Sequence, residues 1–138
     1  IQCLDAEPTV EVATLAEPLR GPHELDDSNI VKVVADAAGR ALYFSRAPIP
    51  YPRDPAAPVE RRRHIGLYAY RAATLMEFAA WPPGTLERVE MLEQLRLLEH
   101  GRAIRVLPAR GRYQAVDTRD DVLKVEQMLI ASVRRGPS

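Results

Sequence analysis

Residues 29–45 read NIVKVVADAAGRALYFS, and this stretch sets the first expectation for the fold. Two runs rich in β-branched and aromatic side chains flank the connection Ala37-Ala38-Gly39. Such side chains favour strands. A glycine in a three-residue connection can adopt the positive φ that a hairpin loop needs. The stretch therefore predicts a β-hairpin.

A proline-rich segment follows the hairpin, and residues 43–54 read YFSRAPIPYPRD. Each proline removes a backbone donor and restricts the residue before it, which excludes regular structure here. Arg46 stands where the second hairpin strand should end. Its guanidinium can bind a carboxylate through two hydrogen bonds, although an ordinary surface arginine fits the same pattern. The segment predicts a loop with Arg46 at its start.

Residues 64–70 read HIGLYAY and alternate as a strand does. The period of two places His64, Tyr68 and Tyr70 on one face and three apolar residues on the other. Gly66 lies between His64 and Tyr68, and its missing side chain leaves room for a ligand to approach the backbone. A half-buried strand whose histidine and tyrosine merely cover the sheet edge gives the same pattern.

The other elements follow from periodicity and from breaker residues. Strands are expected at residues 10–16, 103–109 and 113–117, and helices at 71–80, at 85–99 with Thr85 as its cap, and from 118 onward. Strands and helices alternate in the second half of the chain. This order predicts an α/β layered fold with a mixed sheet.

Glu93 stands out in the helix expected at residues 85–99. At 100° per residue it falls on the same arc as Leu86, Val89 and Leu97. A buried carboxylate must be paired or must face a pocket, since burying it alone is costly. The pattern leaves two interpretations open, a structural ion pair with an arginine and a binding site.

Asp117 lies where a predicted extended segment meets a predicted helix start. Carboxylates at such strand ends face the crevice in which α/β folds bind ligands and their metal ions. A turn or an assisting helix cap explains the same aspartate without any ligand. A single aspartate is also a poor Mg²⁺ site, because the ion is normally shared between carboxylates and phosphates.

Composition narrows the class of protein. The 138 residues suit one domain, and 19 basic and 19 acidic residues give a formal net charge of zero, so no nucleic acid or acidic membrane is expected as a partner. No apolar run approaches the roughly 20 residues of a membrane span. The single Cys3 favours a reducing compartment and hence a cytoplasmic location.

Six segments together resemble a known family: ATLAEPL, NIVKVV, ALYFSRAPIP, RHIGLYAYR, WPPGTLERVEMLEQLRLL and AVDTRDDVLKV. In this order they are similar to the C-terminal half of 3-deoxy-manno-octulosonate (KDO) cytidylyltransferase, the bacterial CMP-KDO synthetase. The likeness runs from about residue 12 to about residue 125. It implies a Rossmann-like, three-layer nucleotidyltransferase fold, usually in a homodimer. It also implies coupling of CTP to KDO with release of pyrophosphate, for lipopolysaccharide synthesis.

The resemblance also implies roles for individual residues. Asp117 matches the family's second metal-binding aspartate in the catalytic site, with Mg²⁺ as the cofactor. The residues that match the sugar site are Arg46, near the sugar carboxylate, His64 and Tyr68 in the pocket, and Glu93 and Gln94 at the sugar hydroxyls. The chain departs from the family where Arg119 replaces a proline after Asp117-Thr118, which should affect only the start of the last helix.

The family's N-terminal half has no counterpart in this chain. That half carries the loop that grips the nucleotide phosphates and the motif that supplies the first metal aspartate. Residues 1–138 are therefore expected to be the C-terminal sugar-binding and dimerisation part of a single cytidylyltransferase domain, inactive alone. Two alternatives stay open, activation of a related acidic sugar and a non-catalytic fragment that serves dimerisation or binding.

Overall fold

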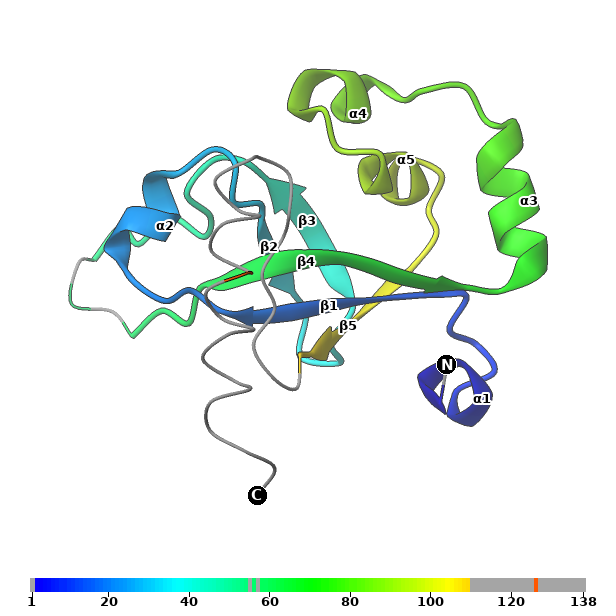
Figure 1. Ribbon diagram of the computed structural model, residues 1–138, viewed down its shortest axis with the longest axis horizontal. Coiled ribbons are helices and arrows are strands. Elements are labelled where there is room, and N and C mark those ends of the chain that lie inside the picture. The colour runs from blue at the N-terminus through cyan, green and yellow to red at the C-terminus, as the bar shows by residue number, and fades with distance from the viewer. Residues whose placement is uncertain (1, 55, 57, 110–125, 127–138) are drawn as a thin grey trace.

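The computed structural model describes residues 2–54, 56, 58–109 and 126 (Figure 1). Its elements are α1 (Gln2–Ala6), β1 (Val12–Pro18), α2 (Pro22–Asp26), β2 (Lys32–Ala35), β3 (Ala41–Ser45), β4 (Arg62–Tyr70), α3 (Ala72–Ala80), α4 (Thr85–Glu90), α5 (Gln94–Glu99) and β5 (Ile104–Pro108). None of the described helices is long and apolar enough to cross a membrane.

The described strands form one mixed sheet in the order β3-β2-β4-β1-β5. β5 runs parallel to β1, and the other neighbours are antiparallel. The predicted hairpin is confirmed, because Val33 pairs with Phe44 and Val34 with Tyr43. Gly39 in its connection has a φ of 76°, as the sequence led us to expect. The α/β class with a mixed sheet is therefore confirmed.

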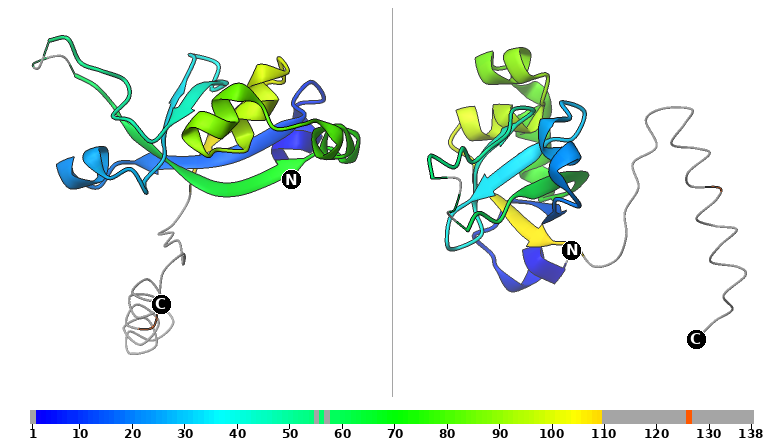
Figure 2. Two further views of the ribbon diagram at one scale, coloured as in Figure 1. Left: turned by 90° about the horizontal axis from the view of Figure 1, so that it is seen from above. Right: turned by 90° about the vertical axis from the view of Figure 1, so that its left-hand side faces the viewer.

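Most of the other predicted elements are also present. Strands were expected at residues 10–16, 64–70 and 103–109, and β1, β4 and β5 occupy these places with bounds shifted by one or two residues. The proline-rich connection between β3 and β4 holds no helix or strand among its described residues and reaches beyond the end of the sheet (Figure 2). Residues 113–117 and the start of the last predicted helix lie outside the described residues.

The pairing of β1 with β4 contains one irregularity. Thr14 is opposite Tyr68, but its neighbour Leu15 is opposite Ile65, so two residues of β4 have no partner on β1. These two residues form a bulge. Because the insertion is even, the alternation of side chains is preserved across it, and His64 and Tyr68 stay on the same face.

The core lies between the sheet and the segment that contains α4 and α5, which cover one face of it (Figures 1 and 2). Alternate residues of the strands point into this space, as a sheet with one buried face requires. The buried members are Val12, Ala16, Val33, Ala41, Phe44, Leu92, Leu95, Leu97, Ile104 and Val106. The side of β4 that carries His64 and Tyr68 therefore faces α5.

The prediction of a single helix over residues 85–99 is wrong. Met91 has left-handed backbone angles, φ 54° and ψ 49°, and it separates α4 from α5. The amide of Leu92 donates to the carbonyl of Glu87 at 3.2 Å, which closes the end of α4 in the manner of a Schellman motif. A glycine normally marks such an end. The sequence carries methionine there, so the break had no local signal.

The break is explained by burial. Leu92, Leu95 and Leu97 are each at most 6% exposed, because α5 turns all three into the core. A straight helix distributes these positions around its axis, since successive residues are 100° apart. The residues left outside are Leu86, Val89 and Met91, which are 38%, 77% and 75% exposed. Tertiary packing has overridden local helix propensity.

Charged side chains hold the two short helices together. Arg96 donates from Nε to one carboxylate oxygen of Glu87 at 2.7 Å and from one terminal nitrogen to the other at 2.5 Å. Its second terminal nitrogen donates to the carbonyls of Phe78 and Trp81 at the end of α3. Thr85 does not cap α4; Gly84 occupies that position, and the Glu99 carboxylate accepts from the backbone amide of Leu86 at 3.0 Å.

The Arg96–Glu87 pair makes stability depend on pH. The hydrogen bonds from Arg96 hold the pKa of Glu87 below its ordinary 4.5. A carboxyl whose pKa is depressed by folding stabilises the folded state above its unfolded pKa. This contribution is lost as the pH falls below about 4.5, toward the folded-state pKa.

We expect Arg96→Gln to lower the free energy of unfolding by about 3 kcal/mol, because it leaves the buried Glu87 carboxylate without its partner. Arg88→Gln is the matched control, since Arg88 is exposed, donates to the carbonyl of Pro83 and has a smaller electrostatic effect on Glu87 than Arg96 has. The control should cost less than about 1 kcal/mol. Denaturant unfolding of the intact protein measures both, and equal losses would contradict the role given to Arg96.

Candidate functional site

His64 and Tyr68 lie side by side on β4, on the face that α5 covers. Their ring centroids are 5.4 Å apart. Gly66 between them belongs to the bulge, and a side chain at that position would meet no atom of a described residue within 4 Å. The space beside the backbone that the sequence predicted at this glycine is therefore present in the fold.

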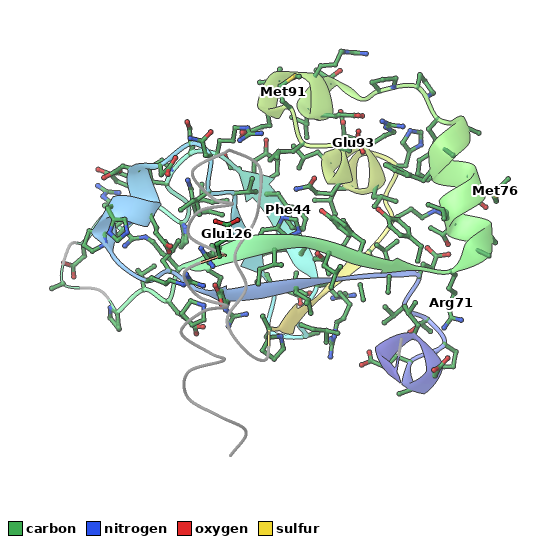
Figure 3. The ribbon with its side chains drawn as sticks, viewed as in Figure 1. Phe44, Arg71, Met76, Met91, Glu93 and Glu126 are labelled. Atoms are coloured by element: carbon green, nitrogen blue, oxygen red, sulfur yellow. The ribbon has the colours of Figure 1, made fainter. Side chains whose placement is uncertain are left out.

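These two rings belong to a continuous row of rings. Neighbouring centroids are 3.9 to 6.4 Å apart along the order Phe44, His64, Tyr68, Tyr70, Phe78, Trp81 and His100. The row crosses from β3 over β4 to α3 and ends beyond α5. Figure 3 shows Phe44 on β3 and Glu93 close to α5. Aromatic rings are rigid, and a polar ligand can pack its apolar face against them.

His64 is neutral at physiological pH. Burial lowers the pKa of its imidazole from 6.5 to about 4. Its Nε2 lies 2.9 Å from the hydroxyl oxygen of Thr14. Its Nδ1 makes no hydrogen bond with any other residue in the described part of the chain. One ring nitrogen therefore has a partner within the fold, and the second has none among the described residues.

Tyr68 carries an unused hydroxyl. The phenol oxygen is buried and has no hydrogen-bond partner among the described residues. Burial raises the pKa of Tyr68 well above its ordinary value, and the nearby Thr14 hydroxyl offsets only part of that effect. A buried polar group without a partner costs about 1–3 kcal/mol. A ligand atom that bonds to this hydroxyl would recover that free energy.

Glu93 and Gln94 begin α5 above the same face of β4. Glu93 is exposed, so the predicted burial on an apolar helical arc is wrong, because the single helix does not exist. Glu93 nevertheless acts electrostatically on the row of rings. Burial is the main cause that raises the pKa of Tyr70, and the negative charge of Glu93 is the second. Gln94 is 7% exposed, and its side chain makes no hydrogen bond with another described residue.

Arg46 is held against the end of α4. Its guanidinium donates to the backbone carbonyls of Glu90 at 2.8 Å, Ser28 at 2.8 Å and Met91 at 3.4 Å. The Glu90 carboxylate accepts from the Ser45 hydroxyl at 2.6 Å and from the Arg46 amide at 3.0 Å. The side chain is therefore fixed by carbonyls at a helix end, where a positive charge is favourable, rather than by the prolines that follow.

Thr14 and Glu90 were missed by the sequence reasoning. Thr14 is a buried hydroxyl on the core face of β1, between Val12 and Ala16, and a polar residue at an apolar position of the period of two was its signal. Glu90 gave no signal, because its role depends on where α4 ends. Its carboxylate joins α4 to β3 through Ser45.

Asp117, the predicted metal ligand, lies outside the described residues. Within the described ranges, no group of three or more histidine, cysteine, aspartate or glutamate side chains could hold a metal ion.

Two surface hollows are formed by described residues, and His64, Glu93 and Gln94 line neither of them. One, of about 320 Å³, lies between β2 and the proline-rich connection, and Pro50 and Arg62 are among its lining residues. The other, of about 240 Å³, is mostly apolar and includes Thr14, Leu67 and Tyr68 at the bulge. Of the sugar-site candidates, Tyr68 lines the second hollow.

Comparison with known proteins gives consistent matches. A family model described as Cytidylyltransferase matches residues 1–104. The 3-deoxy-manno-octulosonate cytidylyltransferase of Acidobacterium capsulatum is 53% identical over 124 residues, which are 90% of this chain and 50% of that protein. The enzyme of the same name from an Anaeromyxobacter species is 52% identical over 125 residues, 91% of this chain and 51% of that protein.

A solved structure shows the same fold. It is that of CMP:2-keto-3-deoxy-manno-octonic acid synthetase complexed with CTP, with a TM-score of 0.87 and 37% sequence identity. The match covers 95% of this chain and 54% of that one. The chain thus spans about half the length of the curated relatives and of the solved structure that it matches.

We expect the His64 ring to titrate near pH 4 rather than near 6.5. Because folding lowers this pKa, protonation favours the unfolded chain, and stability should fall as the pH drops from about 6.5 to about 4. Histidine ring resonances followed by NMR in the intact protein measure the pKa. His64→Gln should remove this part of the pH dependence of unfolding. Titration of His64 at its ordinary pKa would contradict the burial described above.

Proposed function

Because this chain belongs to the cytidylyltransferase family, we propose that the intact protein transfers CMP from CTP to 3-deoxy-manno-octulosonate (KDO). The products are CMP-KDO, used for lipopolysaccharide synthesis, and pyrophosphate. The names of relatives that are more than 50% identical support this choice of sugar and nucleotide. Since the chain spans about half of those relatives, it supplies the sugar side of the site and is inactive alone.

The proposed reaction forms one bond and breaks one. The anomeric hydroxyl oxygen of the sugar attacks the α-phosphorus of CTP and loses its proton. The bond from that phosphorus to the bridging oxygen breaks, and pyrophosphate leaves with the electron pair. For this step the protein must hold the hydroxyl in line with the leaving group, so precise binding of the sugar is the main contribution of these residues.

One observation carries the proposal: three polar groups near α5 and the core face of β4 make no hydrogen bond with another described residue. They are the phenol of Tyr68, whose oxygen is buried, the Nδ1 of His64 and the side-chain amide of Gln94. Folded proteins leave few buried polar groups without partners. A polyhydroxylated ligand supplies donors and acceptors for all of them, and exposed Glu93 at the same helix start can accept from a further hydroxyl.

The carboxylate of the sugar is assigned to Arg46. Three of the N–H groups of its guanidinium bind backbone carbonyls, and the others are available to an anion. The rigid attachment means that little side-chain entropy is lost when the carboxylate binds. The backbone amide of Arg46 also donates to the Glu90 carboxylate, and Glu90 precedes Glu93 by three residues. The residues proposed to bind the sugar carboxylate and the sugar hydroxyls therefore belong to neighbouring segments.

Mg²⁺ is the metal that this family implies. Asp117 would supply one ligand, together with the phosphates of CTP and a carboxylate from the part of the relatives that this chain does not span. The bound ion would neutralise phosphate charge during transfer. A homodimer, as the resemblance of the sequence motifs implies, and a cytoplasmic location, which the single Cys3 favours, complete the proposal.

We expect the intact protein to release pyrophosphate only when CTP, KDO and Mg²⁺ are all present. Glu93→Gln should lower kcat/KM for the sugar roughly 10- to 100-fold, because it removes a charged hydrogen-bond acceptor. Glu77→Gln is the control: Glu77 is exposed on α3, and its partner Arg102 keeps Glu11. A coupled pyrophosphate assay measures all three proteins.

One outcome would reject this function, and another would reject the role given to this face of β4. No pyrophosphate release by the wild-type protein with KDO would exclude KDO, and a panel of related acidic sugars in the same assay would identify another substrate. Unchanged turnover of Glu93→Gln would instead favour a non-catalytic or merely structural role for this face of the protein.

A further inference from the structure

Thr14 makes a hydrogen bond with the His64 side chain. It is 1% exposed and lies on β1 at the point where the pairing with β4 is interrupted. Its hydroxyl oxygen is 2.9 Å from His64 Nε2, 3.0 Å from the carbonyl oxygen of Leu67 and 3.3 Å from that of Ile65. The bulge brings these carbonyls to it, because regular pairing of β1 with β4 stops there.

The hydroxyl of Thr14 has one proton to share among three acceptor or ring-nitrogen neighbours, and the Tyr68 hydroxyl, which can itself donate, lies nearby. Two of them are carbonyl oxygens, which can only accept. If the proton pointed at the imidazole, two oxygens with lone pairs would face each other at 3.0 Å with no proton between them. The hydroxyl therefore donates to a carbonyl of the bulge, and the contact with His64 must be a hydrogen bond from Nε2–H to the hydroxyl oxygen.

We infer that Thr14 is a positioning residue, which fixes His64 in the Nε2–H form and leaves Nδ1 as a hydrogen-bond acceptor for a hydroxyl group of the sugar. A neutral imidazole carries its proton on one nitrogen only, so a donor at Nε2 requires a bare lone pair at Nδ1. This inference rests on the proposed function for the identity of the ligand. The form of the His64 ring follows from the contacts of Thr14 alone.

The pair of His64 and Tyr68 then has a defined chemical preference. Nδ1 of His64 accepts, and the unused phenol of Tyr68 donates. A sugar hydroxyl both donates and accepts, so it can satisfy both groups at once. A carboxylate oxygen cannot, because it would place lone pairs against the Nδ1 lone pair. The pair therefore selects a hydroxyl and directs the sugar carboxylate elsewhere.

The test reads the protonation of the ring directly. Long-range ¹H–¹⁵N NMR spectra of the ligand-free intact protein at pH 7 distinguish a protonated from a bare ring nitrogen. We expect Nε2 to be protonated and Nδ1 bare at His64 in the wild type and in Thr14→Ser, which keeps the hydroxyl. Thr14→Val keeps the branched shape without the hydroxyl, and it should show both forms. A wild-type ring protonated at Nδ1 would overturn the inference, with no variant required.

The kinetic consequence is measured in the same variants. Thr14→Val should raise KM for the sugar roughly five- to tenfold, the effect of losing one well-oriented hydrogen bond, with a smaller change in kcat. Thr14→Ser should restore KM to within about twofold of the wild type. Melting curves accompany each variant, because a folding defect would lower the active fraction and hence the apparent kcat without altering KM.

The outcomes separate this inference from the proposed function. If the wild type does not couple CTP to the sugar, the function is rejected, and the ring form of His64 still decides the role of Thr14. If coupling occurs and Thr14→Val changes neither the ring form nor KM, the positioning role is rejected and the function stands.

Discussion

The interrupted pairing of β1 with β4 is the constraint on which the site depends. Two residues of β4 are left without partners between the Thr14–Tyr68 and Leu15–Ile65 pairs. An insertion of one residue would have sent His64 and Tyr68 to opposite faces, whereas an insertion of two keeps them together. The same bulge supplies the carbonyls that orient the Thr14 hydroxyl, and through it the ring of His64.

The second half of the site comes from the break between α4 and α5. Burial of Leu92, Leu95 and Leu97 turns α5 over the sheet, and its first residues then stand above the rings of β4. The Arg96–Glu87 pair and the Glu99 carboxylate hold this arrangement, so groups that serve stability also set where Glu93 and Gln94 lie. Polar groups left unused by the fold are what a sugar would bind, which links the packing to the proposed chemistry.

The sequence predicted the elements that are specified locally and missed those that depend on tertiary packing. The hairpin followed from Gly39, and the strand with His64 and Tyr68 followed from a period of two, because both signals lie within a few residues. The end of α4 at Met91 had no such signal, so the helical arc that placed Glu93 among apolar residues was wrong. Glu93 nevertheless lies close enough to the rings to raise the pKa of Tyr70. Thr14 and Glu90 act through residues some 50 and 45 positions away, a distance that local patterns do not reach.

The central claim is that one face of β4, with the start of α5 above it, holds an acidic sugar through His64, Tyr68, Glu93 and Gln94. A crystal structure of the intact protein with KDO and a CTP analogue tests it most directly. The account predicts a sugar hydroxyl between His64 Nδ1 and the Tyr68 phenol, with the sugar carboxylate near Arg46. A sugar bound in another part of the protein, with these groups still lacking partners, would contradict it.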